Sequence, residues 1–133
     1  MSASRATYLD SSAIVKLAIR EPESTALRTY LRRRRPLISS GLARTEVIRA
    51  LLPLGPTAVD RGRDVLRRLD LIRINDRVLT TAAELLPPEL RSLDAIHLAT
   101  AHQLGTDLRQ IITYDDRMAT AARDLGLKVS VPT

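Results

Sequence analysis

The chain has 133 residues, enough for one domain, and no cysteine, which excludes disulfides and cysteine-based zinc or redox sites. Its apolar stretches are shorter than the roughly 20 residues of a membrane span, so we expect a soluble, cytoplasmic protein with no membrane partner. Nineteen of its 21 basic residues are arginine and the net charge is +6, a balance that favours a polyanionic partner such as nucleic acid.

Strands and helices are expected to alternate along the chain. Strands are predicted at 7–9, 37–39, 71–74, 110–113 and 127–131, and helices at about 13–18, 23–33, 43–52, 56–69, 76–86, 93–103 and 116–125. Helix N-caps are expected at Ser11 or Ser12, at Asn75 or Asp76, at Ser92, and at Asp115 or Asp116. The alternation predicts one α/β domain over 1–133, with a mostly parallel five-stranded sheet covered on both faces.

Four acidic residues recur at similar places in this arrangement. Asp10 ends the first strand, Glu46 lies in the first turns of the helix after the second strand, Asp94 opens the helix after Ser92, and Asp115 follows the fourth strand. Taken singly, each has an ordinary explanation, because acidic residues are favoured in the first turn of any helix. Taken together, they follow strand ends that meet at one edge of a parallel sheet, so we expect the carboxylates to converge.

Several carboxylates packed together repel one another unless one takes up a proton or a cation lies between them. Hard divalent ions accept carboxylate and water ligands, so Mg²⁺ is the expected occupant, with Mn²⁺ as an alternative. The sequence therefore predicts a metal site formed by Asp10, Glu46, Asp94 and Asp115.

Four segments together resemble the motifs of one enzyme family. They are Tyr-Leu-Asp-Ser-Ser-Ala-Ile-Val-Lys-Leu at 8–17, Glu-Val-Ile-Arg-Ala-Leu at 46–51, Leu-Asp-Ala-Ile-His-Leu-Ala-Thr-Ala at 93–101 and Thr-Tyr-Asp-Asp-Arg-Met at 113–118. This pattern resembles the PIN-domain ribonucleases, and among them the VapC toxins of bacterial toxin–antitoxin pairs. The resemblance covers about 8–131.

The resemblance implies a three-layer α/β/α sandwich and a Mg²⁺-dependent endoribonuclease that hydrolyses RNA phosphodiester bonds with metal-activated water. It implies Asp10, Glu46 and Asp94 as core acids, with Asp115 as the fourth, although Asp116 stands beside it. It also implies transfer RNA or ribosomal RNA as substrate, a cognate antitoxin of the VapB type and a homodimer. An adjacent Asp116 could then serve as the helix cap.

Other functions remain open on the residues alone. A phospho-acceptor receiver domain also has an acidic rim, but it needs a lysine at the end of its last strand, whereas Lys128 falls at the beginning of one. The five glycines form no nucleotide-binding loop. A catalytically silent PIN-like module that binds RNA or protein is the remaining alternative. His97 is interpreted as a partly buried helix histidine that could also orient a site residue.

Overall fold

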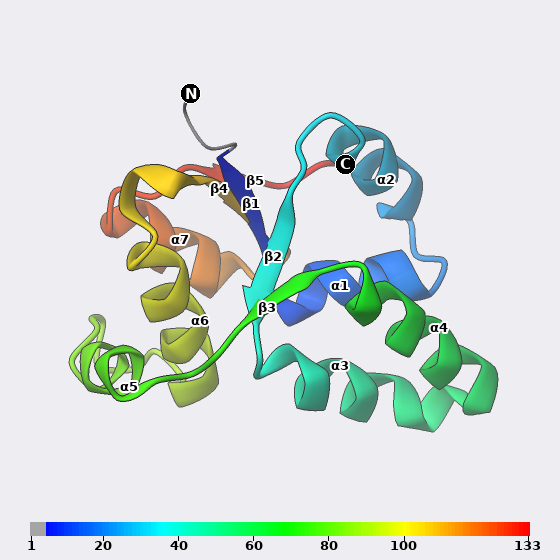
Figure 1. Cartoon of the computed structure of the whole chain (residues 1–133), viewed down its shortest axis with the longest axis horizontal. Helices are drawn as coiled ribbons and strands as arrows, with labels where there is room; N and C mark the ends of the chain where they lie inside the picture. Colours follow the sequence, from blue (N-terminus) through cyan, green and yellow to red (C-terminus); the bar gives the residue numbers. More distant parts are fainter. Residues whose placement is uncertain (1–4) are drawn as a thin grey trace.

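The computed structural model describes residues 5–133 and contains a five-stranded sheet (Figure 1). Its strands are β1 (Ala6–Leu9), β2 (Leu37–Ser40), β3 (Asp70–Ile72), β4 (Leu108–Ile112) and β5 (Val129–Ser130). They lie in the order β3-β2-β1-β4-β5, and every neighbouring pair is parallel. The predicted parallel sheet is confirmed, with β1 at its centre.

The helices cover both faces of the sheet. They are α1 (Ser11–Ala18), α2 (Ser24–Leu31), α3 (Ala43–Leu51), α4 (Pro56–Arg67), α5 (Asp76–Ala83), α6 (Ser92–His102) and α7 (Asp116–Asp124), with short 3₁₀ turns η1 (Leu52–Leu54) and η2 (Gly105–Asp107). Figure 1 shows α1 to α4 on one side of the sheet and α5 to α7 on the other, which confirms the three-layer sandwich. Among residues 5–133, none of these helices is long and apolar enough to cross a membrane.

Consecutive residues of β1 pack into different layers, because side chains alternate across a strand. Leu9 belongs to an apolar cluster with residues of α1 to α4, such as Ile14 and Leu51. Tyr8 belongs to a second cluster with residues of α6 and α7, such as Leu98 and Met118. Burial on both faces fixes the register of β1 and so fixes the position of the residue that follows it.

The hairpin of α3 and α4 depends on one glycine. A Cβ atom built on Gly62 of α4 would collide with the Cδ1 atom of Leu51 on α3. The absence of a side chain therefore allows the two helices to approach closely, and α3 is held where it carries Glu46 towards the sheet edge.

Several predicted element boundaries are wrong by a few residues. The fifth helix ends at Ala83 and not at 86, since the residue before Pro87 is biased away from helical geometry. The predicted cap at Ser92 is also wrong. Arg91 is the N-cap of α6, it makes no capping bond through its side chain, and Ser92 is the first helical residue. Asn75 caps α5 by accepting from the Val78 N–H.

Candidate active site

The four acidic residues lie on elements that meet at the C-terminal edge of the sheet. Asp10 follows β1 and Asp115 follows β4, and these two strands are neighbours. Glu46 is on α3, directly after β2, and Asp94 is in the first turn of α6. The chain crosses over in opposite directions on the two sides of β1, which is where ligands collect in open parallel sheets.

Asp10 is buried, with 4% of its surface exposed, and both oxygens of its carboxylate accept hydrogen bonds. Its Oδ1 accepts from the Ser12 hydroxyl at 2.6 Å and from the Ala13 N–H at 3.0 Å, and its Oδ2 accepts from the Thr113 hydroxyl at 2.6 Å. Asp10 is thus the N-cap of α1, and the predicted caps at Ser11 or Ser12 are wrong. An aspartate just before a helix reaches the free N–H groups of the first turn as well as a serine does.

Burial opposes ionisation of Asp10. Desolvation raises the pKa of this carboxyl above its ordinary value, and the hydrogen bonds from Ser12, Thr113 and the Ala13 N–H only partly oppose that rise. A bound cation would favour the charged form, so the site gains from a positive charge beside Asp10.

Asp94 and Asp115 are joined by Arg91. The Arg91 Nε lies 3.0 Å from Oδ2 of Asp94, and one of its terminal nitrogens lies 2.9 Å from Oδ2 of Asp115. The guanidinium is exposed, yet it brings the two carboxylates to a single positive group. Hydrogen bonding to Asp94, and then the charges of Asp94 and Asp115, raise the pKa of Arg91.

Asp115 has two roles at once. Its Oδ1 accepts from the Met118 N–H at 3.0 Å and caps α7, while its Oδ2 faces Arg91. The cap that was expected at Asp115 or Asp116 is therefore Asp115, and the idea that Asp116 serves as the cap is wrong. Asp116 is exposed in the first turn of α7.

Glu46 is held by two donors on one oxygen. Its Oε1 accepts from the Ser11 hydroxyl at 2.7 Å and lies 2.6 Å from Nε2 of His97. Burial raises the pKa of the Glu46 carboxyl, but the hydrogen bonds from His97 and Ser11 outweigh burial and bring the pKa below its ordinary value. Glu46 is therefore ionised at neutral pH.

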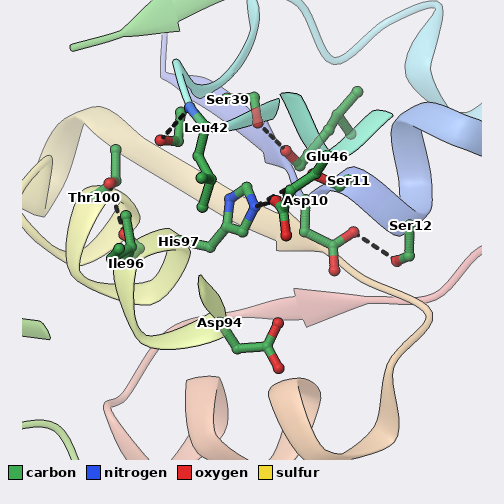
Figure 2. A network of polar contacts seen from close by, with 12 residues as sticks. Asp10, Ser11, Ser12, Ser39, Leu42, Glu46, Asp94, Ile96, His97 and Thr100 are labelled. Atoms are coloured by element: carbon green, nitrogen blue, oxygen red, sulfur yellow. Dashed lines mark hydrogen bonds and ion pairs between the residues drawn. The ribbon is translucent and has the colours of Figure 1, made fainter. Parts of the chain in front are cut away.

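The sequence did not predict the contacts that His97 and Arg91 make with the acidic residues. His97 is fully buried and not partly buried, and it contacts Glu46 directly. Figure 2 shows it reaching from α6 towards Glu46, Ser11 and Asp10, while Asp94 on the same helix lies apart. Arg91 was not predicted at all, although its position three residues before Asp94 allows a helical ion pair.

The acids do not form one ready cluster. Within residues 5–133, no group of three or more His, Cys, Asp or Glu side chains is arranged to hold a metal ion. Asp94 and Asp115 instead share Arg91, and Glu46 pairs with His97. The donors are carboxylate oxygens, the ligands that Mg²⁺ and Mn²⁺ prefer, and the guanidinium already places a positive charge between two of them. The chemistry of these residues fits a hard cation in the place of Arg91.

A hollow opens beside this group. It has a volume of about 1120 Å³, and Arg91 and Asp94 line it together with Arg117 and the segment 85–90, which is apolar except for Glu89. Of the four candidate acids, Asp94 alone lines this hollow, and Asp10 is buried.

Comparison with known proteins gives a consistent result. The model of the PIN domain matches residues 7–124. The chain is 62% identical to Ribonuclease VapC46 of Mycobacterium tuberculosis, over 96% of this chain and 98% of that protein. It is 43% identical to Ribonuclease VapC35 of the same species, over 94% of this chain and 96% of that protein.

The fold is also similar to solved structures. One is a toxin-antitoxin complex from Klebsiella pneumoniae, with a TM-score of 0.70 and 20% identity over 96% of this chain and 98% of that one. Another is Mycobacterium tuberculosis VapC20, a sarcin-ricin loop cleaving toxin, with a TM-score of 0.72 and 16% identity over 86% and 94%.

Proposed function

Since the chain belongs to the PIN-domain family and to its VapC-type ribonucleases, we propose that it is a Mg²⁺-dependent endoribonuclease and the toxin of a VapBC-type pair. The observation that carries this proposal is the bridge that Arg91 makes between Asp94 and Asp115, on elements that reach the same edge of the sheet as Asp10. A catalytically silent relative is expected to have lost one of the four acids, whereas Asp10, Glu46, Asp94 and Asp115 are all present in this chain.

We assign the metal to Asp10, Asp94 and Asp115, with Glu46 completing the acidic set. The chemistry supplied by a bound Mg²⁺ or Mn²⁺ is activation of water and neutralisation of charge on the scissile phosphate. Ser12, Thr113 and the Ala13 N–H fix both oxygens of Asp10, so this ligand is oriented before any cation arrives. The cap bond to Met118 does the same for Asp115.

Glu46 is the residue that we assign to hold water and accept its proton. Its Oε1 is engaged by Ser11 and His97, while Oε2 has no hydrogen-bond partner among the described residues. An ionised carboxylate with one free oxygen accepts a hydrogen bond from water without rearrangement. The role of Asp94 and Asp115 is to hold the positive charge that draws the RNA phosphate to the same place.

The remaining assignments follow from the same family. We assign transfer RNA or ribosomal RNA as substrate, a VapB-type antitoxin as partner, and the cytoplasm as the place of action. A homodimer is also proposed, because Leu79, Leu86 and Leu93 are exposed around α5 and the start of α6 and a second copy can bury them.

Cleavage of RNA by the purified chain tests the function. Bulk transfer RNA and ribosomal RNA are incubated with the protein in Mg²⁺, in Mn²⁺ and in EDTA, and the products are separated by size. We expect discrete fragments with either metal and none in EDTA. Binding of RNA without cleavage in any metal would instead identify the chain as a silent RNA-binding module.

A substitution of Arg91 tests the place of the cation. Arg91→Gln removes the guanidinium that competes with a metal for Asp94 and Asp115. Because exposed ion pairs are weak, we expect Mn²⁺ to bind about two- to fivefold more tightly, as measured by calorimetric titration. Arg67→Gln is the matched control, since Arg67 is also exposed and pairs with an aspartate three residues away in the chain. Equal Mn²⁺ affinity in the wild type, Arg91→Gln and Arg67→Gln would show that Arg91 does not compete with the metal.

The arginine-rich surface predicts a strong salt dependence. In the structure of residues 5–133, only Arg63, Arg67 and Arg91 pair with carboxylates, so most of the nineteen arginines are available to phosphates. If about five phosphates are contacted, the affinity for a single-stranded oligoribonucleotide falls about 100-fold between 50 and 200 mM salt. The affinity at each salt concentration is measured by fluorescence anisotropy in EDTA, which prevents cleavage. A flat response would mean that the arginine excess does not serve RNA binding.

A further inference from the structure

A buried chain of side chains connects the core of the sheet to Glu46. The Tyr8 hydroxyl on β1 lies 2.7 Å from Nδ1 of His97 on α6, and Nε2 of the same ring lies 2.6 Å from Oε1 of Glu46 on α3. Tyr8 and His97 are at most 1% exposed. The imidazole ring of His97 therefore connects α6, on one face of the sheet, with β1 in the sheet and with α3 on the other face.

The donors and acceptors in this series of hydrogen bonds can be assigned by starting from Glu46. A carboxylate oxygen only accepts, so the 2.6 Å contact between Oε1 of Glu46 and Nε2 of His97 needs a hydrogen on Nε2. In a neutral imidazole Nδ1 is then the acceptor, and the Tyr8 hydroxyl 2.7 Å away donates to it. The ring is held at both nitrogens and cannot rotate without losing two buried hydrogen bonds.

The result is a carboxylate with a defined orientation. His97 and the Ser11 hydroxyl both contact Oε1 of Glu46, and Ser11 also lies 3.3 Å from Nε2 of His97. The two donors come from different helices, so they fix the carboxylate in two directions. The other oxygen of Glu46 remains available to water or to a ligand.

We propose that His97 is a positioning residue of the cleavage reaction, and that Tyr8 holds its ring in place so that Nε2 keeps Glu46 oriented. This inference rests on the proposed ribonuclease function. It differs from the common case of a structural helix histidine because the ring ends on a carboxylate at the candidate site and not on backbone or water. His97 acts through Glu46 and does not itself touch the substrate.

Kinetics of matched variants test the proposal. Tyr8→Phe removes only the hydroxyl that holds the ring, and Tyr30→Phe is the control, since the Tyr30 hydroxyl bonds Gln110 and Ser130 outside the candidate site. Loss of such a supporting group costs about 10- to 100-fold. We expect this loss in kcat for Tyr8→Phe with KM for RNA unchanged, and no loss for Tyr30→Phe.

A second pair separates positioning from packing. His97→Gln keeps an N–H that can reach Glu46, whereas His97→Leu keeps apolar volume alone, so kcat should be partly retained in the first and lost in the second. His102→Gln, at an exposed position of the same helix, serves as the control. Equal kcat in the Gln and Leu variants of His97, or normal kcat in Tyr8→Phe, overturns the proposal.

NMR provides a readout that needs no cleavage of RNA. In ¹⁵N-labelled protein, the Nε2 of His97 should carry a protected, hydrogen-bonded proton, and that proton should become exchangeable in Tyr8→Phe. An Nε2 without a proton in the wild type overturns the assignment. Failure of the wild-type protein to cleave RNA while the Nε2 proton is present overturns the ribonuclease function, and so distinguishes the two failures.

Discussion

Replacing Asp10 by asparagine is expected to reduce RNA cleavage about a thousandfold, which corresponds to about 4 kcal/mol of activation free energy. The two side chains have nearly the same shape, so the asparagine can still accept from the Ala13 N–H and cap α1. What the variant lacks is the negative charge that the proposed cation requires. The measurement is the initial rate of cleavage at saturating RNA and Mg²⁺, with Asp116→Asn as the control at an exposed site.

The same variant should be more stable than the wild type at neutral pH. The pKa of Asp10 is raised in the folded protein, so the folded state holds this proton more tightly than the unfolded chain does. The wild type therefore loses stability as the pH rises from the ordinary carboxyl pKa to the raised one, and asparagine avoids that loss. In EDTA we expect Asp10→Asn to melt about 3–5 °C higher near pH 7.5 and to show little advantage near pH 3. Lower stability of the variant at both pH values would contradict the assigned burial cost.

A second pair of variants decides between the adjacent aspartates. Asp115→Asn should reduce cleavage about 100-fold, or about 3 kcal/mol, because it removes the charge that faces Arg91. Asparagine is as good an N-cap as aspartate, so the bond to the Met118 N–H and the start of α7 should be preserved. Asp116→Asn removes an exposed charge from the next position and should leave cleavage unchanged.

Rates and melting temperatures of both variants are compared in the same buffer. Full activity in Asp115→Asn together with a large loss in Asp116→Asn would reverse the assignment. A large loss in Asp115→Asn accompanied by a lower melting temperature would mean that the helix cap, and not the charge, accounts for the effect.

The fold was predictable because its signals are local. The spacing of apolar residues and the breaks at proline and glycine predicted five strands and seven helices, all of which are present with shifted ends. The caps were predicted less well. At the start of α1, three residues in a row, Asp10, Ser11 and Ser12, can each cap a helix, and only the orientation of the chain after β1 selects Asp10.

The contacts around the candidate site were harder to predict. Tyr8 and His97 are separated by 89 positions in the sequence, and His97 and Glu46 by 51, so no local pattern links them. Arg91 was missed for a different reason. An arginine near the start of a helix has no typical role there, and its bond to Asp115 depends on the approach of α6 to α7. The placement of the acids after strands that end at one edge, in contrast, follows from parallel topology. The expected gathering of their carboxylates into one group is not seen among residues 5–133, because Arg91 lies between Asp94 and Asp115 and Glu46 pairs with His97.

Anomalous diffraction from crystals soaked in Mn²⁺ tests the central claim most directly. We expect one or two strong Mn²⁺ peaks at the edge of the sheet after β1 and β4, about 2.0–2.2 Å from carboxylate oxygens of Asp10 and of Asp94 or Asp115, with the Arg91 guanidinium displaced. An edge without Mn²⁺ at millimolar concentration, with Arg91 still joining Asp94 and Asp115, would contradict the proposal that these acids hold a catalytic cation.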